Sequence, residues 1–572
     1  MKSEPSRTKN KELVQIFETM ADALEFKGEN PFKVNAYRKA ARVLGEIDLD
    51  IAAVKEEEEL MRIPGIGSGI AKKIIEYLTT GRIKKYEEAI KGIPVSLLEL
   101  LKIQNLGPKT LALAHKKLKV KSIDDLIRVI ENGQLARLPQ MGEKKVENIR
   151  KGIEIFLSTQ QRMSIYEATE ISEEVIEYLK RKTKVKRISA AGSLRRMKET
   201  IGDIDILATG RDGEKIIEKF ATMPGVKQVL AQGSTKGSVI LENGRQVDLR
   251  LVPPESYGAA LQYFTGSKAH NIRLRDIAKA KGMKLNEYGL FKGKKRIAGR
   301  TELEIYQALG LEYVPPELRE DRGEVELAQR HQPFDLITLE DIKGDLHVHT
   351  NYSDGEASIE AMARQAMEMG YEYILITDHS KSAKYAGGID EERLLEQIEE
   401  IDNLNRKLRK FRILKGIEVD ILNDGSLDLD DEVLKRLDLV IGAIHSGFKR
   451  NVTGRMLDAM DNPHLHIIAH PTGRLISRRE GYDVDIGKII ERAAEKNVAL
   501  ELNSYYDRLD LNDINLMRAK EAGVKIAIGT DAHNREGMGM IRFGVGTARR
   551  GWLTKTDVLN CLPLRSLLEW RR

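Results

Sequence analysis

The hydrophobic and polar positions of the chain change their pattern twice. Residues 10–160 follow a helical period broken by short Gly/Pro turns, without the alternation that is typical of strands. Between 163 and 315, β-rich runs appear at 185–191, 204–209, 238–242 and 246–252, with helical stretches between them. From 341, strand-type runs alternate with helical ones, and the candidate strands are 344–348, 373–377, 412–417, 439–444, 465–469, 498–502 and 525–529.

These patterns predict a multidomain chain with three kinds of architecture. The first part is all-α, the second is α+β, and the third is an α/β barrel of seven parallel strands. Residues 316–340 contain Pro316, Pro333 and a charged stretch, and they predict a linker. A length of 572 residues fits about four domains of roughly 150 residues each.

Composition excludes several classes of protein. The chain is 41% hydrophobic and 32% charged, which is typical of globular proteins. Its one cysteine, Cys561, excludes a disulfide framework within the chain and cysteine-based zinc fingers. No run approaches the roughly 18 apolar residues of a membrane helix, and the first residues hold no apolar signal segment. We therefore expect a cytoplasmic protein.

Charge and histidine are unevenly distributed along the chain. Residues 1–162 carry +7 (30 basic against 23 acidic side chains), whereas residues 341–572 carry −5 (34 against 39). A basic front is as consistent with ordinary surface charge as with a polyanion partner. Eight of the eleven histidines lie after residue 340, which points to metal binding there.

Three glycine turns in the first part share one pattern. The stretches 63–71, 103–111 and 138–146 each place glycine before a helix whose first turn holds Lys, Ser or Thr. They resemble helix-hairpin-helix motifs, in which backbone N–H groups approach a phosphate without reading bases. The positions expected to contact double-stranded DNA here are Gly65, Gly67, Gly107, Lys109, Gly142 and Lys144.

Three carboxylates in the second part suit divalent cations. Asp203 and Asp205 lie two residues apart at the start of the predicted strand 204–209, so we expect them to share a face, and Asp248 lies on another strand. Such carboxylates repel one another unless a cation lies between them, and Mg²⁺ prefers oxygen ligands. Gly192-Ser193, between a strand and a helix, has the geometry that cradles phosphate. Together these residues indicate a nucleotidyltransferase.

The flanking motifs favour one family over a tRNA-type nucleotidyl transferase. Tyr263-Phe264-Thr265-Gly266-Ser267, with Asn271, Arg275 and the early run 35–41, resembles the family X DNA polymerases, which include DNA polymerase beta. The resemblance implies that Asp203, Asp205 and Asp248 hold two Mg²⁺ ions and that Asp248 helps to deprotonate the primer 3′-hydroxyl. It implies a nucleotide site of Gly192, Ser193, Arg196, Gly202, Tyr263, Phe264, Gly266 and Asn271, with Arg250 and Arg275 on DNA. Gln246 departs from the family's arginine.

The same resemblance implies two further features of the helical region. Lys73 aligns with the nucleophile of the family's 5′-deoxyribose-phosphate lyase, and Lys33 and Tyr37 align with its phosphate site. Simple 5′-phosphate binding by Lys73 is nearly as well supported as lyase activity. Backbone carbonyls of Leu101, Ile103 and Leu106 are implied to bind Na⁺ or K⁺.

Metal-type side chains follow the predicted strands of the third part. They lie at the carboxyl ends of the strands, where α/β barrels place their active sites. The nine residues are His347, His349, Asp354, His379, Glu418, His445, His470, Asp531 and His533. His464 and His466 lack this placement and are expected to be structural, whereas Asn503, Lys384 and Arg474 are candidate substrate or phosphate contacts.

This constellation resembles the PHP (polymerase and histidinol phosphatase) domain. The resemblance implies three Mn²⁺ or Zn²⁺ ions, with Glu418 bridging, in three groups: His347, His349, Glu418 and Asp531; Glu418, His445 and His470; and Asp354, His379 and His533. A clustered site of this kind lowers the pKa of bound water and clamps a phosphodiester.

Together the two resemblances are to the family X polymerases of bacteria and archaea. They imply a monomeric gap-filling DNA polymerase of the nucleoid, with deoxynucleoside triphosphates as substrates and a 3′–5′ exonuclease that also suits 3′-end trimming or cutting at abasic sites. The role implied is base excision repair or end processing. Two alternatives are a small-ester phosphatase tethered to a DNA-binding module and a non-catalytic DNA-end scaffold. The expected divisions are 1–92 (lyase-like), 93–162 (fingers-type), 163–258 (palm), 259–315 (thumb), 316–340 (linker) and 341–572 (PHP).

Overall fold

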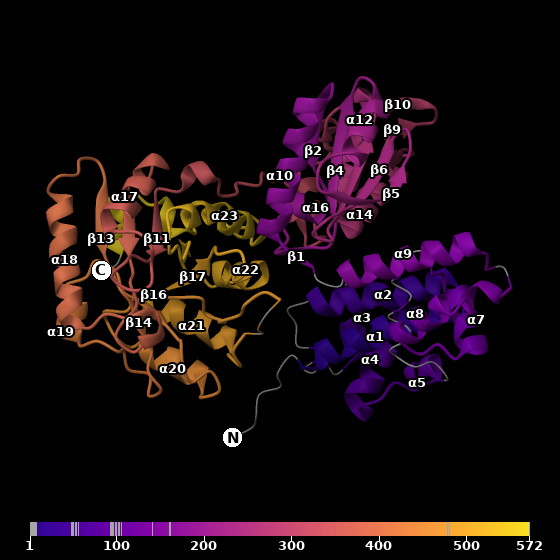
Figure 1. The fold of residues 1–572 in the computed structure, drawn as a ribbon. Coiled ribbons are helices and arrows are strands. Elements are labelled where there is room, and N and C mark those ends of the chain that lie inside the picture. The colour runs from indigo at the N-terminus through magenta and orange to yellow at the C-terminus, as the bar shows by residue number, and fades with distance from the viewer. Residues whose placement is uncertain are drawn as a thin grey trace. The chain divides into compact units, whose positions relative to one another are not determined.

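The chain forms two compact units in the computed structural model, Met1–Gln161 and Arg162–Arg572. The structure describes residues 8–46, 51, 54, 56–63, 65–91, 97, 100, 103, 106–139, 141–159, 162–477, 479 and 481–570. Figure 1 shows the helices of the first unit in indigo and purple, and the sheets of the second from magenta to yellow.

The described residues of the first unit are helical, as the sequence predicts. Phe17, Leu44, Ile74 and Leu111 belong to one buried core that the helices share. Gly81, in the left-handed conformation (φ +71°), ends α4. The α-helices are α1 (Thr8–Phe26), α2 (Pro31–Glu46), α3 (Glu57–Met61), α4 (Ser68–Thr80), α5 (Lys84–Ile90), α7 (Pro108–Leu118), α8 (Ile123–Glu131) and α9 (Glu143–Thr159).

The palm region of the second unit is a mixed five-stranded sheet in the order β2-β4-β7-β6-β5. Ile171, Val175 and Phe220 on its helices share a core with Ile206 and Val247 of the two central strands. The strands of this sheet are β2 (Val185–Ala190), β4 (Ile204–Gly210), β5 (Val226–Gln232), β6 (Lys236–Leu241) and β7 (Gln246–Leu251). A separate pair is formed by β1 (Met163–Ser164) and β3 (Thr200–Ile201). The helices are α10 (Ile165–Lys182), α11 (Gly192–Arg195) and α12 (Gly213–Ala221). All four predicted strands are present, and β5 is an additional one.

The thumb region combines helices with a small antiparallel sheet in the order β10-β9-β8. Its elements are η4 (Pro254–Ser256), α13 (Tyr257–Thr265), α14 (Lys268–Ala280), β8 (Lys284–Asn286), β9 (Gly289–Lys292), β10 (Lys295–Ala298) and α15 (Glu302–Ala308). The pattern of the sequence did not predict this sheet, because its strands are only three or four residues long, too short to show an alternation.

The segment predicted as a linker, 316–340, is folded instead. It contains η5 (Pro316–Leu318), α16 (Glu324–Gln329) and η6 (Leu339–Asp341). Leu318 and Ala328 are buried in the core of the thumb, and Ile337 is buried in the core of the C-terminal domain. The segment therefore fixes one region to the other within the second unit.

The C-terminal domain is built on parallel strands at all seven predicted places. The third predicted strand ends at Lys415, and an additional strand, β14, follows it. The strands form a three-stranded sheet, β11-β12-β13, and a five-stranded sheet, β14-β15-β16-β17-β18. Isolated parallel bridges join the sheets, His379 to Glu418 and Val348 to Ala532. The strands are β11 (Gly344–Val348), β12 (Tyr373–Ile376), β13 (Arg412–Lys415), β14 (Glu418–Asp420), β15 (Ile441–Ala443), β16 (Ile467–Ile468), β17 (Ala499–Asn503) and β18 (Ile526–Gly529). Closure into a regular barrel stays a prediction.

Alternate side chains of these strands enter two different cores. Leu346, Leu375 and Ile441 belong to one cluster, whereas Ile374 and Ile413 belong to the cluster that the helices share. The helices are α17 (Ile359–Glu368), α18 (Glu391–Asn405), α19 (Asp431–Leu434), α20 (Val452–Ala459), α21 (Ile486–Lys496), α22 (Asp513–Glu521), α23 (Ile541–Arg550) and α24 (Leu564–Trp570). Among the helices that the structure describes, none is long and apolar enough to cross a membrane.

Candidate active sites

The palm carboxylates lie at the centre of the mixed sheet. β4 pairs in parallel with β7, and the register places Asp205 directly beside Asp248. Asp248 Oδ1 accepts hydrogen bonds from Ser238 Oγ at 2.5 Å and from Gln246 Nε2 at 3.0 Å. Gln246, the departure from the family pattern, thus orients the third carboxylate. Among the described residues, these three aspartates do not approach one another as closely as the ligand atoms of the C-terminal cluster, which lie within 4.8 Å.

Mutual repulsion marks these carboxylates as a cation site. Burial, together with the charges of Asp203 and Asp248, raises the pKa of Asp205 to about 7. Desolvation and the charge of Asp248 also raise the pKa of Asp203. A divalent cation bound by their oxygens would remove this repulsion, so the donor set fits Mg²⁺.

A glycine beside Asp205 is required by the geometry of the site. Gly192 has φ +61°, and a Cβ there would lie 2.3 Å from Asp205 Oδ2. Ser193 follows it on the short helix α11, and Arg196 Nη1 donates to the carbonyl of Thr265 at 2.5 Å. The predicted phosphate cradle therefore borders the carboxylates.

The predicted sugar and base contacts lie on α13 and α14. The rings of Tyr263 and Phe264 meet edge to face at 5.2 Å, and the Arg250 guanidinium lies 4.8 Å from the Phe264 ring. Asn271 is 9% exposed, donates to the carbonyl of Tyr263 at 2.7 Å and accepts from Gln262 at 2.6 Å. Arg275 Nε donates to the carbonyl of Asn271 at 3.2 Å, so the two residues share a face as expected.

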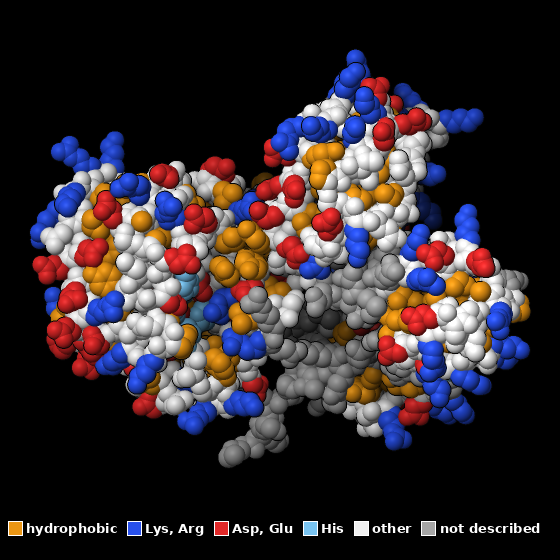
Figure 2. Space-filling view, in the orientation of Figure 1, with side chains coloured by type: hydrophobic (Ala, Val, Ile, Leu, Met, Phe, Trp, Pro, Cys, Tyr) orange, Lys and Arg blue, Asp and Glu red, His pale blue; other side chains and the backbone are white. Residues whose placement is uncertain are grey.

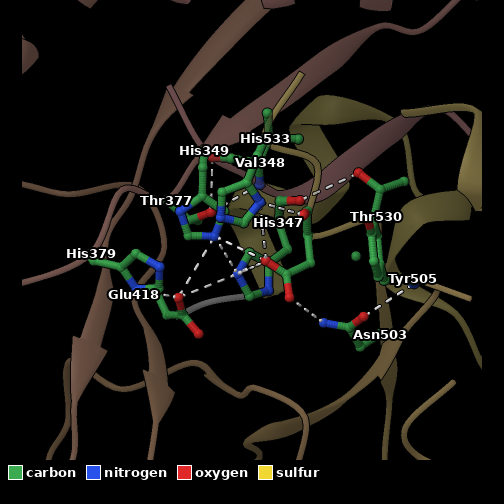
Figure 3. A network of polar contacts seen from close by, with 12 residues as sticks. His347, Val348, His349, Thr377, His379, Glu418, Asn503, Tyr505, Thr530 and His533 are labelled. Carbon is green, nitrogen blue, oxygen red and sulfur yellow. Dashed lines mark hydrogen bonds and ion pairs between the residues drawn. The ribbon is translucent and has the colours of Figure 1, made fainter. Parts of the chain in front are cut away.

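The nine C-terminal residues converge on one place, as their position after successive strands predicts. Figure 3 shows His347, His349, His379 and His533 directed toward Glu418 and one another, and Figure 2 shows histidines reaching the surface of this domain. His347 Nε2 and His349 Nε2 lie 3.1 Å apart, and His349 Nε2 lies 3.1 Å from Asp531 Oδ1. His533 Nε2 lies 3.3 Å from Asp354 Oδ1.

Glu418 lies at the centre of this cluster. It is 1% exposed, and its carboxylate lies 3.0 Å from His470 Nε2 and 3.4 Å from His445 Nε2. His379 Nδ1 lies 2.8 Å from Glu418 Oε2, but without hydrogen-bond geometry. Among the described residues, ligand atoms within 4.8 Å of one another form three groups: His349, Asp354, His379 and His533; His347, His349 and Asp531; and His379, Glu418 and His445. These groups overlap the predicted ones, but His349 and His379 are the shared residues, Glu418 belongs to one group rather than two, and His470 belongs to none of them.

Buried ligand atoms without hydrogen bonds show that the cluster fits metal ions. Nδ1 of His349, His379 and His470 and Oε2 of Glu418 are buried and make no hydrogen bond within the described residues. An unpaired polar atom is costly to bury unless it binds a cation. Mixed imidazole and carboxylate ligands suit Mn²⁺ or Zn²⁺.

The electrostatics of two histidines and of Glu418 point the same way, whereas in His347, His445 and His533 burial would lower the pKa but neighbouring carboxylates raise it. Burial lowers the pKa of His349 to about 3 and, with the charge of Arg508, that of His470 to about 4, which keeps both imidazoles in the neutral, metal-binding form. Burial would raise the pKa of Glu418, but His445, His379 and His347 hold it well below its usual range. The carboxylate is therefore ionised.

Several groups that support the ligands were not predicted. Glu501 Oε1 accepts from His347 Nδ1 at 2.6 Å, and Asp420 Oδ1 lies 3.1 Å from His445 Nδ1. Arg508 Nε lies 3.3 Å from Asp531 Oδ2. These contacts fix the imidazole tautomers and the orientation of the carboxylate. Glu501 lies on the buried strand β17. An acidic residue inside a buried strand is unusual, and this was the sequence feature that could have identified Glu501 as a supporting residue.

The three secondary candidates of this domain have different surroundings. Asn503 Nδ2 donates to Asp531 Oδ2 at 3.0 Å, and Lys384 lies in η7 (Lys384–Ala386). Arg474, predicted as a phosphate contact, instead pairs with Glu199 of the palm at 2.6 Å and donates to the carbonyl of Arg508. His466 Nδ1 accepts from the Val440 N–H at 3.1 Å, which is a structural contact.

The predicted lyase residues of the first unit lie near one another. Lys73 Nζ lies 5.7 Å from the Tyr37 ring and donates to the carbonyl of Gly69 at 2.7 Å. Burial lowers the pKa of Lys73, and Lys85 and Lys33 lower it further against the opposing effect of Glu76. A lysine that loses its proton more easily suits a nucleophile, and neighbouring lysines suit phosphate.

The glycine turns precede helices, as predicted. Gly67 and Gly107 are the N-cap residues of α4 and α7, and Gly142 directly precedes α9. Lys144 is exposed in the first turn of α9. Of the cation ligands expected at the second turn, Leu101 lies outside the described residues, and the carbonyl of Ile103 accepts from the Leu106 N–H at 3.1 Å.

Family models match five successive parts of the chain. They are a helix-hairpin-helix domain (8–83), a SAM-like helix-hairpin-helix tandem (97–154), the DNA polymerase beta palm (162–252), the DNA polymerase beta thumb (260–320) and the PHP domain (345–505). A protein of Bacillus subtilis (strain 168), "DNA polymerase/3'-5' exonuclease PolX", is 42% identical over 97% of this chain and 98% of its own length. The chain belongs to the family X DNA polymerases. Its resemblance to that family and to the PHP domain is confirmed.

Two further relatives share only part of the chain. A rat DNA polymerase lambda is 28% identical over 56% of this chain and 57% of its own length. A probable phosphatase of Thermoanaerobacter sp. (strain X514) is 32% identical over 38% of this chain and 89% of its own length. Members of family X with a PHP domain depend on divalent metal ions and act on DNA, and the cluster around Glu418 has ligands for such ions.

Proposed function

We propose that this family X polymerase fills short gaps in double-stranded DNA and removes nucleotides from 3′ ends at a second active site. The observation that carries the proposal is the presence, in one chain, of two separate ligand sets, the palm aspartates and the cluster around Glu418. The relative from Bacillus subtilis carries both activities in its name. The role is base excision repair or DNA end processing, and the domain divisions expected from the sequence, except the linker at 316–340, form part of the proposal.

In the palm, the side chains would orient the reactants. Two bound Mg²⁺ ions would supply charge neutralisation for the transferred phosphate. Asp248, held by Ser238 and Gln246, accepts a proton from the primer 3′-hydroxyl. Ser193, Arg196 and Gly202 hold the triphosphate, and the ring of Tyr263 lies against the sugar.

In the C-terminal domain, nine ligands would hold three Mn²⁺ or Zn²⁺ ions. When bound, ions in such a cluster would lower the pKa of a bound water and hold a phosphodiester. Glu501 and Asp420 keep His347 and His445 in the tautomers that leave the other ring nitrogen free for metal. Arg508 orients Asp531.

The helical unit would hold the DNA. The glycine turns contact backbone phosphates, and Lys73 with Lys33 and Tyr37 binds a 5′-phosphate or acts as the lyase nucleophile. Borohydride trapping on an abasic-site substrate separates these roles, because only Schiff-base chemistry gives an adduct that Lys73→Ala abolishes. Na⁺ or K⁺ at the second turn and a monomeric state are further parts of the proposal.

A 5′-labelled primer on a one-nucleotide gap tests both activities together. The wild type, Asp205→Ala and His349→Ala are incubated with Mn²⁺, with and without deoxynucleotides, beside Glu218→Ala and His464→Ala as controls outside both sites. Asp205→Ala should only shorten the primer, and His349→Ala should only extend it. If nothing extends, the palm proposal fails. If nothing shortens the primer but a small phosphate ester is hydrolysed, the domain is a phosphatase, which the Thermoanaerobacter relative also favours.

A further inference from the structure

A buried group of ion pairs joins the palm, the segment after the thumb and the C-terminal domain. Arg550, the last residue of α23, is 4% exposed. Its guanidinium donates to Glu320 Oε1 at 3.0 Å, to Asp513 Oδ2 at 2.7 Å and to the backbone carbonyl of Arg196 at 2.7 Å. Arg322 binds the same oxygen of Asp513 at 3.0 Å. We call Arg196, Glu320, Arg322, Asp513 and Arg550 the junction cluster.

The palm member of the junction cluster faces the polymerase site. Arg196 Nε donates to Glu320 Oε1 at 3.0 Å and Nη1 donates to the carbonyl of Thr265, whereas Nη2 makes no hydrogen bond within the described residues. Its positive charge also lowers the pKa of Asp205, against the larger opposing effects of burial and the neighbouring aspartates. Arg196 therefore binds Glu320 and also acts on the charge of Asp205, and its Nη2 nitrogen is left for a ligand.

Glu320 is shared between two arginines. The same oxygen, Oε1, accepts from Arg196 and from Arg550. Burial would raise the pKa of Glu320, but Arg550, Arg196 and Lys198 lower it to about 2, so the group is ionised. Without Arg550, this buried negative charge would act mainly on Arg196 and draw its guanidinium away from an anionic ligand.

Helix α23 of the C-terminal domain packs closely against the palm next to Arg196. A Cβ on Gly546 of α23 would lie 2.3 Å from Met197 Cε, so the backbone of the helix packs against the residue next to Arg196. A displacement of α23 would therefore displace Met197 and, with it, the neighbouring Arg196.

We propose that Arg550 of the C-terminal domain is a positioning residue of the polymerase site. By binding Glu320 and the carbonyl of Arg196, it keeps the Arg196 guanidinium oriented toward the triphosphate of the incoming nucleotide. The inference rests on the proposed role of Arg196 in binding that triphosphate. It means that the exonuclease domain supplies part of the geometry for nucleotide binding.

Gap-filling kinetics with the full chain test this coupling. Arg550→Met should raise the KM for the deoxynucleotide about tenfold, the size expected when one charge-assisted hydrogen bond is lost, and should change kcat by less than about twofold. Exonuclease activity should not change. Arg550→Lys should recover part of the loss. The matched control is Arg549→Met, because Arg549 pairs at the same junction with Glu317 and makes no contact with Glu320 or Arg196.

A double-mutant cycle with Arg196→Met decides whether Arg550 acts through Arg196. In a chain that already carries Arg196→Met, Arg550→Met should not raise the KM further. If the rise in KM of the double variant instead equals the product of the two single-variant rises, Arg550 does not act through Arg196 and the inference is overturned. An equal KM for Arg550→Met and Arg549→Met would overturn it as well. If Arg196→Met leaves KM unchanged, the proposed triphosphate contact itself fails, and the inference fails with it.

Glu320→Gln provides the test if Arg550→Met does not fold. It keeps an acceptor for Arg196 Nε but removes the competing charge, so the KM for the nucleotide should fall about threefold. A KM equal to that of the wild type would overturn the inference.

Discussion

Replacing Gly192 by alanine should slow primer extension by the polymerase and leave the exonuclease rate unchanged. The added Cβ would lie 2.3 Å from Asp205 Oδ2, whereas ordinary contacts begin at 3.4 Å, so the carboxylate must move by about 1 Å. A displacement of that size costs about 100-fold in rate. The left-handed conformation at φ +61° adds about 1–2 kcal/mol of strain for a residue with a Cβ.

Single-turnover gap filling at saturating nucleotide measures this effect. Gly225→Ala is the matched control, because Gly225 is also left-handed at φ +81° but a Cβ there meets nothing within 4 Å. Gly192→Ala should extend the primer about 100-fold more slowly than the control while both shorten it equally. If the two variants extend at the same rate, contact between Gly192 and Asp205 does not matter for the reaction.

Three other predictions concern the support of the sites. Glu501→Gln should weaken metal binding about 10- to 100-fold, measured as the Mn²⁺ concentration for half-maximal exonuclease activity, with the exposed Glu495→Gln unchanged. Chelation should abolish primer shortening, and added Mn²⁺ should restore it; permanent loss would instead indicate unfolding. Burial would raise the pKa of Glu302, but Arg319 and Arg195 lower it to about 2. The ionised carboxylate therefore contributes about 3 kcal/mol to the free energy of unfolding above pH 4.5, and this contribution is lost as the pH falls toward 2. The fall in melting temperature between pH 7 and pH 3 should therefore be smaller in Glu302→Gln.

Residues that follow strands were predictable from the sequence because their placement is local. A strand alternates its faces, so Asp205 on β4 was expected to face the same side as Asp203, which directly precedes that strand, and the register of β4 with β7 places Asp248 beside Asp205. The metal-type residues of the C-terminal domain follow successive parallel strands, whose carboxyl ends meet. Neither inference needed knowledge of the loops.

The supporting residues escaped prediction because their partners are remote in sequence. His347 and Glu501 are separated by 154 positions, and the sequence places each of them on a buried strand without indicating that they touch. Strands β8 to β10 were missed for a different reason, since strands of three or four residues are too short to show a hydrophobic period. Arg474 shows the converse error, because it was assigned to phosphate from its charge alone, whereas it pairs with Glu199.

The segment 316–340 shows why charge alone is an ambiguous signal. Prolines and charged residues are typical of a solvated linker, and the sequence offers no apolar period that would oppose this interpretation. Yet Arg319 is 0% exposed and Glu320 is 7% exposed, because Arg319 pairs with Glu302 and Glu320 pairs with Arg196 and Arg550. A charged side chain is tolerated in the interior only where an opposite charge pairs with it. The partner of Arg319 lies 17 positions away in the sequence, and the two partners of Glu320 lie 124 and 230 positions away. A charged stretch between two domains can therefore be the part of the chain that fixes one domain to the other.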